Sequence, residues 1–304
     1  MENQRKVIAL GCFDGVHLGH GALLRRVAEA AGAESALPCA FTFDQSPAAA
    51  LTGQAVPLLT TVEDRRWLME TLYGIQELIV APFPLMRDMD WRDFVTDYLQ
   101  KELGVIHAVA GHDFRFGYQG EGNPRRLKEL CGERGIGCDI IPRVEVDGIT
   151  VSSTCIRTLI AEGKPEEAAR FLGHPHVLSG TVAHGHGLGR TLGAPTANLP
   201  VQPGVIVPAF GVYASRVILP KVGARPAVTN VGVRPTVDQS MTNVTVEPWI
   251  LDYQGDLYGK SVHLELYKRL RPERRFGSTD ELRAAIVHNA EETRQYFAAK
   301  ERTS

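Results

Sequence analysis

The sequence lacks the features that would assign it to several specialised classes of protein. Its 304 residues carry 33 Lys and Arg against 35 Asp and Glu, and the resulting net charge of -2 creates no strong field toward nucleic acid or anionic lipid. Hydrophobic residues make up 44% and charged residues 22%, which excludes a disordered, collagen-like or coiled-coil chain. We therefore expect a globular protein that acts on small molecules, with no nucleic-acid or membrane partner, and leave a homo-oligomer open.

Cysteine is scarce, and long uninterrupted apolar runs are missing. The 5 cysteines are scattered without a C-x-x-C pair, so neither a disulfide framework nor a zinc site is indicated. The N-terminus carries Glu2, Arg5 and Lys6, and the apolar stretch before Asp14 is too short for a secretion signal. The longest stretch without a charged residue, residues 191–215, is interrupted by prolines and cannot form a membrane helix. These features predict a cytoplasmic protein.

Hydrophobic patterning predicts an α/β first half. Apolar runs alternate there with stretches whose apolar residues recur at helical spacing. The predicted strands lie at residues 7–13, 37–43, 77–83 and 105–111, and the predicted helices at residues 21–32, 60–74 and 90–104. Such alternation is typical of a parallel sheet with helices on its faces.

The pattern changes after a short predicted helix at residues 164–173. Beyond it, short β-rich stretches separated by Gly and Pro predict a small antiparallel barrel or sandwich. A last amphipathic helix begins at a capping box formed by Ser278 and Glu281. The length also suggests two domains, at about 150 residues per domain, and we place them at residues 1–173 and 174–304.

The most informative stretch of the first half is residues 11–20, GCFDGVHLGH, between a predicted strand and a predicted helix. A helix N-terminus at this point presents unpaired N–H groups and the positive end of the helix dipole, which favour a nucleotide phosphate. His17 and His20, spaced i and i+3, can both donate hydrogen bonds to that phosphate as negative charge builds up on it. Histidines can also begin a helix without any function, but the paired glycines and the H-x-G-H spacing favour a phosphate site.

H-x-G-H is the signature of the nucleotidyltransferase superfamily, and the longer motif resembles the adenylyltransferase module of the prokaryotic bifunctional riboflavin kinase/FAD synthetase family. Residues 111–117, GHDFRFG, and residues 151–157, VSSTCIR, resemble two further motifs of that module. The resemblance implies a Rossmann-like domain with a parallel sheet, in which His17, His20 and Arg157 are catalytic. The arginine would grip the β- and γ-phosphates and ease the departure of pyrophosphate. The nucleotide-binding residues that the resemblance implies are Gly11, Phe13, Asp14, Gly19, Asp44, Asp113, Ser152, Ser153 and Thr154.

The second half has its own dense motif at residues 180–199, GTVAHGHGLGRTLGAPTANL. Its glycines allow the backbone to approach a polyphosphate closely. Thr196 and Asn198, alternate residues of an extended segment, can direct two oxygens at one Mg²⁺. His184 and His186 also fit a metal site, but the sequence offers no third ligand nearby, and we favour solvated loop residues.

The string GRTLGAPTAN within this motif resembles the ATP and Mg²⁺ motif of riboflavin kinases, and later stretches follow the same module. The resemblance implies a small antiparallel β-barrel of riboflavin kinase type with a terminal helix. It implies that Thr196 and Asn198 hold the metal, and that Glu247 is the base that removes the proton of the ribityl 5′-hydroxyl. The ATP-binding and flavin-binding residues that it implies are Gly180, Gly189, Arg190, Gly193, Pro195, Arg271 and Phe276.

We therefore predict two activities: phosphorylation of riboflavin by ATP to FMN and ADP, and adenylylation of FMN by ATP to FAD and pyrophosphate, with Mg²⁺ as cofactor. Ser46 stands where the family commonly has a histidine, and Cys155 where an arginine is frequent. Two alternatives stay open, a kinase with a weakened adenylyl half and a flavin-binding regulator without catalysis. The presence of the histidine pair together with Glu247 argues against the regulator, because a pure binding protein needs no general base.

Overall fold

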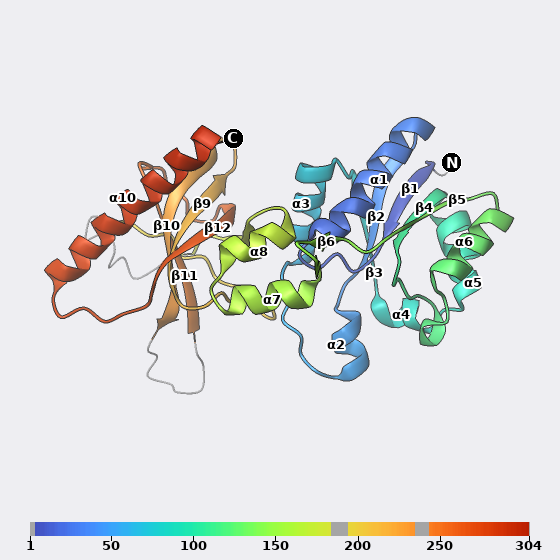
Figure 1. The fold of residues 1–304 in the computed structure, drawn as a ribbon, viewed down its shortest axis with the longest axis horizontal. Coiled ribbons are helices and arrows are strands. Elements are labelled where there is room, and N and C mark those ends of the chain that lie inside the picture. The colour runs from blue at the N-terminus through green and yellow to red at the C-terminus, as the bar shows by residue number, and fades with distance from the viewer. Residues whose placement is uncertain (1–3, 184–193, 235–242, 304) are drawn as a thin grey trace. The chain divides into compact units, whose positions relative to one another are not determined.

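The structure is a computed structural model that describes residues 4–183, 194–234 and 243–303. The chain divides into two compact units, Met1–Ser153 and Thr154–Ser304 (Figure 1). No helix in the described ranges is long and apolar enough to span a bilayer.

A five-stranded parallel sheet forms the centre of the first unit. Its strands are β1 (Lys6–Leu10), β2 (Leu37–Phe43), β3 (Glu77–Ala81), β4 (Val105–Gly111) and β5 (Gly137–Ile141). They lie in the order β3-β2-β1-β4-β5, and every neighbouring pair is parallel. The predicted parallel sheet is confirmed. The chain order reverses beside β1, and in open α/β sheets this switch point is where ligands bind, outside the carboxyl ends of the strands.

Helices cover both faces of this sheet (Figure 1). On one face α1 (Leu18–Glu34) packs on β1, β2 and β4, with α3 (Val62–Tyr73) beside it. On the other face Ile8 and Leu10 of β1 join a core with the π-helix η1 (Phe94–Glu102) and α6 (Pro124–Glu133). The remaining short elements of this unit are α2 (Pro47–Thr52), α4 (Phe83–Asp88), α5 (Trp91–Asp93), η2 (Tyr118–Gly120), β6 (Glu145–Val146) and β7 (Ile149–Thr150).

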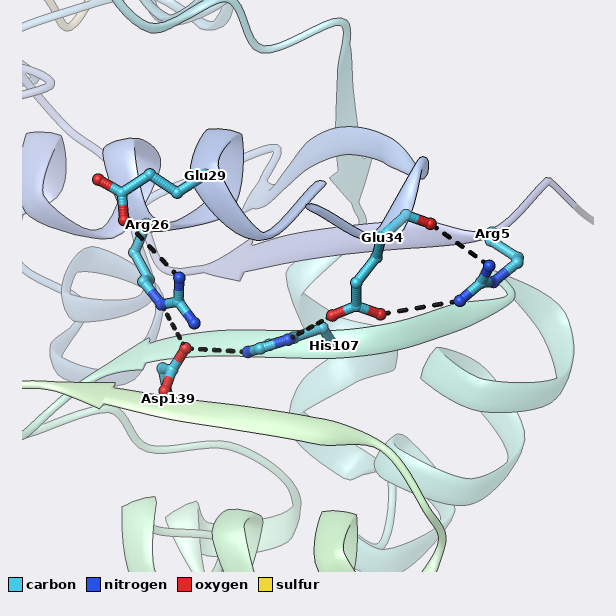
Figure 2. Close-up of polar contacts among 6 residues, drawn as sticks. All are labelled: Arg5, Arg26, Glu29, Glu34, His107 and Asp139. Atoms are coloured by element: carbon cyan, nitrogen blue, oxygen red, sulfur yellow. Dashed lines mark hydrogen bonds and ion pairs between the residues drawn. The ribbon is translucent and has the colours of Figure 1, made fainter. Parts of the chain in front are cut away.

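A polar cluster ties α1 to the edge of the sheet (Figure 2). His107 of β4 lies with Nδ1 3.0 Å from Glu34 Oε1 and Nε2 3.0 Å from Asp139 Oδ2, and Arg26 donates to the same Asp139 oxygen at 2.6 Å. Burial raises the pKa of Asp139, but the hydrogen bonds from Arg26 and His107 outweigh it and hold that pKa below its ordinary value.

The second unit contains a curled five-stranded antiparallel sheet. Its strands are β8 (His176–Thr181), β9 (Gly211–Leu219), β10 (Gly223–Arg234), β11 (Asn243–Ile250) and β12 (Ser261–Pro272), in the order β11-β10-β9-β12-β8. A short segment joins its two edges: Asn198 bridges to Ala183, beyond β8, and Leu199 bridges to Val246 of β11. The predicted small antiparallel barrel is therefore confirmed.

Three helices complete the described part of the second unit, and the first two belong to it by their packing. In α7 (Ser153–Ala161), the carbonyl of Ile160 accepts from the amide of Ala209 at 3.4 Å, and α8 (Pro165–Leu172) packs against β8 and β12. The division between the compact units thus falls after Ser153, the first residue of α7, whereas the pattern of the sequence changes after α8.

The C-terminal helix α10 (Thr279–Thr303) lies along β9 and β10 (Figure 1). Its start differs in detail from the predicted capping box. Ser278 Oγ accepts from the amide of Glu281 at 3.2 Å, as expected, but the Glu281 carboxylate accepts from Gly277 N–H, at 2.9 Å.

Candidate active sites

The first candidate site is the turn that connects β1 to α1 at the switch point of the sheet. Gly11 follows β1, Gly111 ends β4 and Asp44 follows β2, so the motifs predicted to bind nucleotide meet at one edge of the sheet. Asp113, two residues beyond β4, is exposed there. Asp44 is also exposed, and its Oδ1 accepts from the amide of Phe83 at 3.0 Å.

The turn has an unusual backbone. Phe13 and Val16 adopt positive φ angles of 55° and 43°, beside Gly15 at 85°. Conformations of this kind cost non-glycine residues of order 1–3 kcal/mol each and persist only where the surrounding structure enforces them. Both residues are 0% exposed, and the ring of Phe13 packs edge-on against His20 with the centroids 5.0 Å apart.

The two histidines form one stacked pair at the start of α1. Their rings lie 3.6 Å apart, with an angle of 11° between their planes. His17 is the N-cap, and its Nδ1 accepts from the amide of His20 at 3.3 Å. The neutral His17 ring therefore carries its proton on Nε2, where it is a hydrogen-bond donor.

Gly19 explains the spacing H-x-G-H. A Cβ atom at this position would lie 3.1 Å from Cε1 and 3.2 Å from Nδ1 of His17. Any side chain there would press on the imidazole and disturb the stack, so the glycine leaves room for the ring.

The surroundings keep His20 neutral. Burial, the neighbouring His17 ring and the positive charge of Arg65 hold the pKa of His20 well below its ordinary value. Two rings stacked this closely cannot both carry a positive charge at low cost. In its neutral form His20 still carries one ring proton that it can donate in a hydrogen bond.

Asp14 connects the turn to the segment before α3 through hydrogen bonds. It is 6% exposed, and its Oδ1 accepts from the amides of Leu59 and Thr60 at 2.8 and 3.1 Å. The hydroxyl of Thr60 in turn accepts from Gly15 N–H at 2.8 Å. The nucleotide-binding role of Asp14 stays a prediction.

Arg65 and Thr60 are residues of this site that the sequence analysis missed. Arg65 is 3% exposed, and its Nη1 donates to the carbonyl of Cys12 at 3.1 Å. A signal was present in the sequence, because helical spacing puts Arg65 on the same face of α3 as the buried Leu68 and Met69. A charged residue on an apolar stripe indicates a special partner.

The motif at residues 151–157 begins against the same turn. Ser153 Oγ donates to the carbonyl of Asp14 at 2.9 Å, with Ser152 beside it and half-buried. Thr154 and Arg157 follow on α7, in the part of the chain grouped with the second unit, where Thr154 is exposed and Arg157 half-buried.

The second candidate site is a row of polar side chains across the barrel. Leu199 bridges to Val246, and Ala197 N–H donates to the carbonyl of Pro248 at 2.9 Å, so Asn198 stands opposite Glu247. On the other side Glu247 pairs with Asn230 of β10. Directly opposed residues of antiparallel strands share a face, so these three side chains lie on one face of the sheet. All three are half-buried.

The structure therefore brings together the predicted base and one of the predicted metal ligands. Thr196, two residues before Asn198, is exposed, as is Pro195. Gly180 lies within β8, where a Cβ atom would meet Leu199 at 3.1 Å. The remaining predicted residues of this loop, Gly189, Arg190 and Gly193, and the histidines His184 and His186, lie outside the described residues.

The same row continues to the predicted flavin-side residues. Asn230 pairs with Val212, and Val212 with Arg271 of β12. The Arg271 guanidinium lies 5.3 Å from the ring centroid of Phe276, and Arg274 lies over that ring at 4.7 Å. Burial and the charge of Arg274 lower the pKa of Arg271. Arg271 and Phe276 thus lie side by side, and their predicted contact with the flavin stays a prediction.

Comparison with known proteins gives matches to both halves. A family model for FAD synthetase matches residues 1–155, and one for riboflavin kinase matches residues 172–297. The bifunctional riboflavin kinase/FMN adenylyltransferase of Listeria monocytogenes is 34% identical over 301 residues, which cover 97% of this chain and 94% of that protein. The enzyme of the same description from Escherichia coli is 35% identical over 294 residues, 96% and 92% of the two chains.

A solved structure is similar along the whole chain as well. It is described as a macrolide-efflux protein from Streptococcus pneumoniae, and it matches with a TM-score of 0.82, 30% identity and 97% of both chains.

The fold and the two matching family models define a transferase with an adenylyltransferase half and a kinase half. The chain belongs to the family of bifunctional riboflavin kinase/FMN adenylyltransferases. The predicted family and the two predicted activities in flavin cofactor biosynthesis are thereby confirmed.

Proposed function

We propose that the β1–α1 turn carries out the adenylylation of FMN. The observation that supports this is the neutral, stacked pair of His17 and His20 at a helix N-terminus beside the switch point of the sheet. A phosphate oxygen of FMN attacks the α-phosphorus of ATP, and pyrophosphate leaves. The His17 Nε2–H and the unpaired amides of the helix start donate to the α-phosphate oxygens as charge builds up, and Arg157 receives the leaving pyrophosphate.

We propose that the polar row of the barrel carries out the phosphorylation of riboflavin. Glu247, flanked across the strands by Asn198 and Asn230, accepts the proton of the ribityl 5′-hydroxyl while the γ-phosphoryl group is transferred. Arg271 and Phe276 bind the flavin: the Phe276 ring stacks on it, and the Arg271 guanidinium interacts with it through its positive charge.

Mg²⁺ fits the second site as a partner of ATP. Thr196 and Asn198 would hold it through a hydroxyl and an amide oxygen, which are the hard donors that this ion takes. Among the described residues no group of three His, Cys, Asp or Glu forms a separate metal cluster. Bound there, the ion would neutralise charge on the phosphates, and most of its coordination would come from ATP and water.

We also propose the finer assignments. The adenylyl reaction belongs to residues 1–173 and the kinase reaction to residues 174–304, and the protein works in the cytoplasm on riboflavin, FMN and ATP.

Two reciprocal variants test the site assignment in the full-length protein. With riboflavin, ATP and Mg²⁺ resolved by chromatography, His20→Ala should accumulate FMN, with FAD formation slowed by about 10²–10³. Glu247→Gln should slow FMN formation by roughly 10²–10⁴ and still convert added FMN to FAD. His288→Ala and Glu291→Gln, both exposed on α10, serve as controls. Loss of both activities in either folded variant would refute the separation of the sites.

A further inference from the structure

Two buried side chains from a different part of the chain hold the β1–α1 turn. We infer that Arg65, together with Thr60, is a positioning residue for adenylyl transfer, which keeps the turn in the conformation that presents the two histidines. This inference rests on the proposed adenylyl site. It concerns residues that do not touch the reacting atoms and act only through the turn.

Thr60 holds the middle of the turn. It is 2% exposed; its hydroxyl accepts from Gly15 N–H at 2.8 Å and lies 3.4 Å from Asp14 Oδ1. Its amide donates to the same Asp14 oxygen at 3.1 Å. These bonds span 45 residues of sequence and end on residues between the two positive φ angles of Phe13 and Val16. They therefore supply the external restraint that a strained backbone requires.

Arg65 holds the start of the turn. Its Nη1 donates to Cys12 O and to Thr42 Oγ1, both at 3.1 Å, and its Nη2 donates to Thr60 O at 3.4 Å. The Thr42 hydroxyl donates to the same Cys12 carbonyl at 2.8 Å. One guanidinium thus joins the turn, the end of β2 and the segment before α3.

Burial of the Arg65 guanidinium costs free energy, and stability alone does not explain why an arginine stands at this position. The position lies on the apolar face of α3, and Nε is buried without a hydrogen-bond partner among the described residues. A well-packed apolar side chain in place of a buried ion is often neutral or stabilising. The fixed fork of the guanidinium, in contrast, suits the accurate placement of backbone groups.

The charge of Arg65 also reaches the histidines. Arg65 and His17 both disfavour a positive charge on His20. The other ionisable groups that act on this turn or on Arg65 are Cys12, Asp14, Glu63, Asp64 and Asp113. Of these, Asp14 and Asp113 act against Arg65, and Cys12 is a thiol whose pKa is raised to about 11, mainly by burial. Removal of the guanidinium should therefore make His20 easier to protonate.

The test compares neighbouring arginines of α3. Arg65→Met should lower the kcat of FMN adenylylation by about 100-fold, the effect expected when reacting groups are misplaced by about 1 Å. Arg66→Met is the matched control, because Arg66 is exposed on the same helix, and it should change kcat less than twofold. Arg65→Lys keeps the charge and loses the fork, so it should recover part of the rate, to about 10-fold below the natural enzyme.

The pH profile separates a positioning role from a general loss of structure. In Arg65→Met the acid limb of kcat should move to higher pH, whereas in Arg65→Lys and Arg66→Met it should stay in place. If Arg65→Met does not fold, Arg65→Lys and Thr60→Val test the positioning role instead. Both should lower the adenylylation kcat at least 10-fold. Adenylylation within twofold of the Arg66→Met control in folded Arg65→Met, or in both substitutes, overturns the inference.

His20→Ala in the same assay distinguishes a wrong positioning role for Arg65 and Thr60 from a wrong assignment of the adenylyl site. If His20→Ala abolishes adenylylation and Arg65→Met does not, only the positioning role is wrong. If neither substitution lowers adenylylation, the site itself is elsewhere and the inference falls with it.

Discussion

Gly137, at the start of β5, faces the imidazole of His107, and its substitution tests the polar cluster of Figure 2. A Cβ atom on Gly137 would lie 2.5 Å from Nδ1 and 2.7 Å from Cγ of His107. Carbon and nitrogen atoms prefer separations of about 3.5 Å, so in Gly137→Ala the ring must move by about 1 Å. Both of its contacts, to Glu34 and Asp139, are now 3.0 Å and would leave hydrogen-bonding range.

The size of the effect follows from the exposure of the partners. A buried hydrogen bond to a charged group is worth about 1.5–3 kcal/mol. The side chains of Glu34 and Asp139 are 34% and 35% exposed, so water replaces part of each lost bond. We take about 1 kcal/mol for each bond, and Gly137→Ala should lower the free energy of unfolding of the first unit by about 2 kcal/mol.

A double-mutant cycle isolates this cause. In a His107→Ala background the obstacle is gone, and Gly137→Ala should change stability by no more than about 0.5 kcal/mol. Gly132→Ala on α6, where a Cβ atom meets nothing within 4 Å, is the control and should stabilise by about 0.5–1 kcal/mol. Equal destabilisation by Gly137→Ala in both backgrounds would refute the contact as the cause.

Urea unfolding followed by tryptophan fluorescence measures these values. The chain has 3 tryptophans, and only Trp249 belongs to the second unit. In a Trp249→Phe background the signal therefore reports on the first unit alone. The same background serves all members of the cycle.

Three other outcomes are expected. The first unit should lose stability as the pH falls from 7 to 5, because His20 takes up a proton near its ordinary pKa of about 6.5 in the unfolded chain but not in the folded chain, where its pKa is lowered. In urea titrations, the free energy of unfolding of His20→Asn should depend less on pH. An unchanged dependence would contradict the lowered pKa. In calorimetry, a fragment of residues 154–304 should melt roughly 5 °C or more above a fragment of residues 174–304, because α7 and α8 pack on the barrel. Equal melting temperatures would argue against that packing. Thr196→Val and Asn198→Leu should raise the concentration of Mg²⁺ and ATP that riboflavin phosphorylation requires, without unfolding the barrel. Unchanged kinetics in both variants would show that residues 196–198 have only a structural role in the barrel.

The local features of this protein could be predicted from the order of its residues. The alternation of strands and helices, the parallel sheet and the antiparallel barrel follow from apolar periodicity, which neighbouring residues set. The H-x-G-H motif is local in the same sense, since the His17 cap, the room at Gly19 and the stack with His20 all arise within one helical turn. The order of the family's motifs then indicated both activities.

Which residues from distant parts of the chain come into contact is visible only in the folded protein. Thr60 and Arg65 contact the β1–α1 turn only because α3 packs beside α1, and Asn198, Glu247 and Asn230 line up only through the register of three separate strands. Register and helix packing depend on how whole elements assemble, and a shift by one residue would turn a side chain to the opposite face. Periodicity within one segment contains no information about that alignment, so the row across the barrel and the buried arginine beneath the turn became visible only in the folded chain.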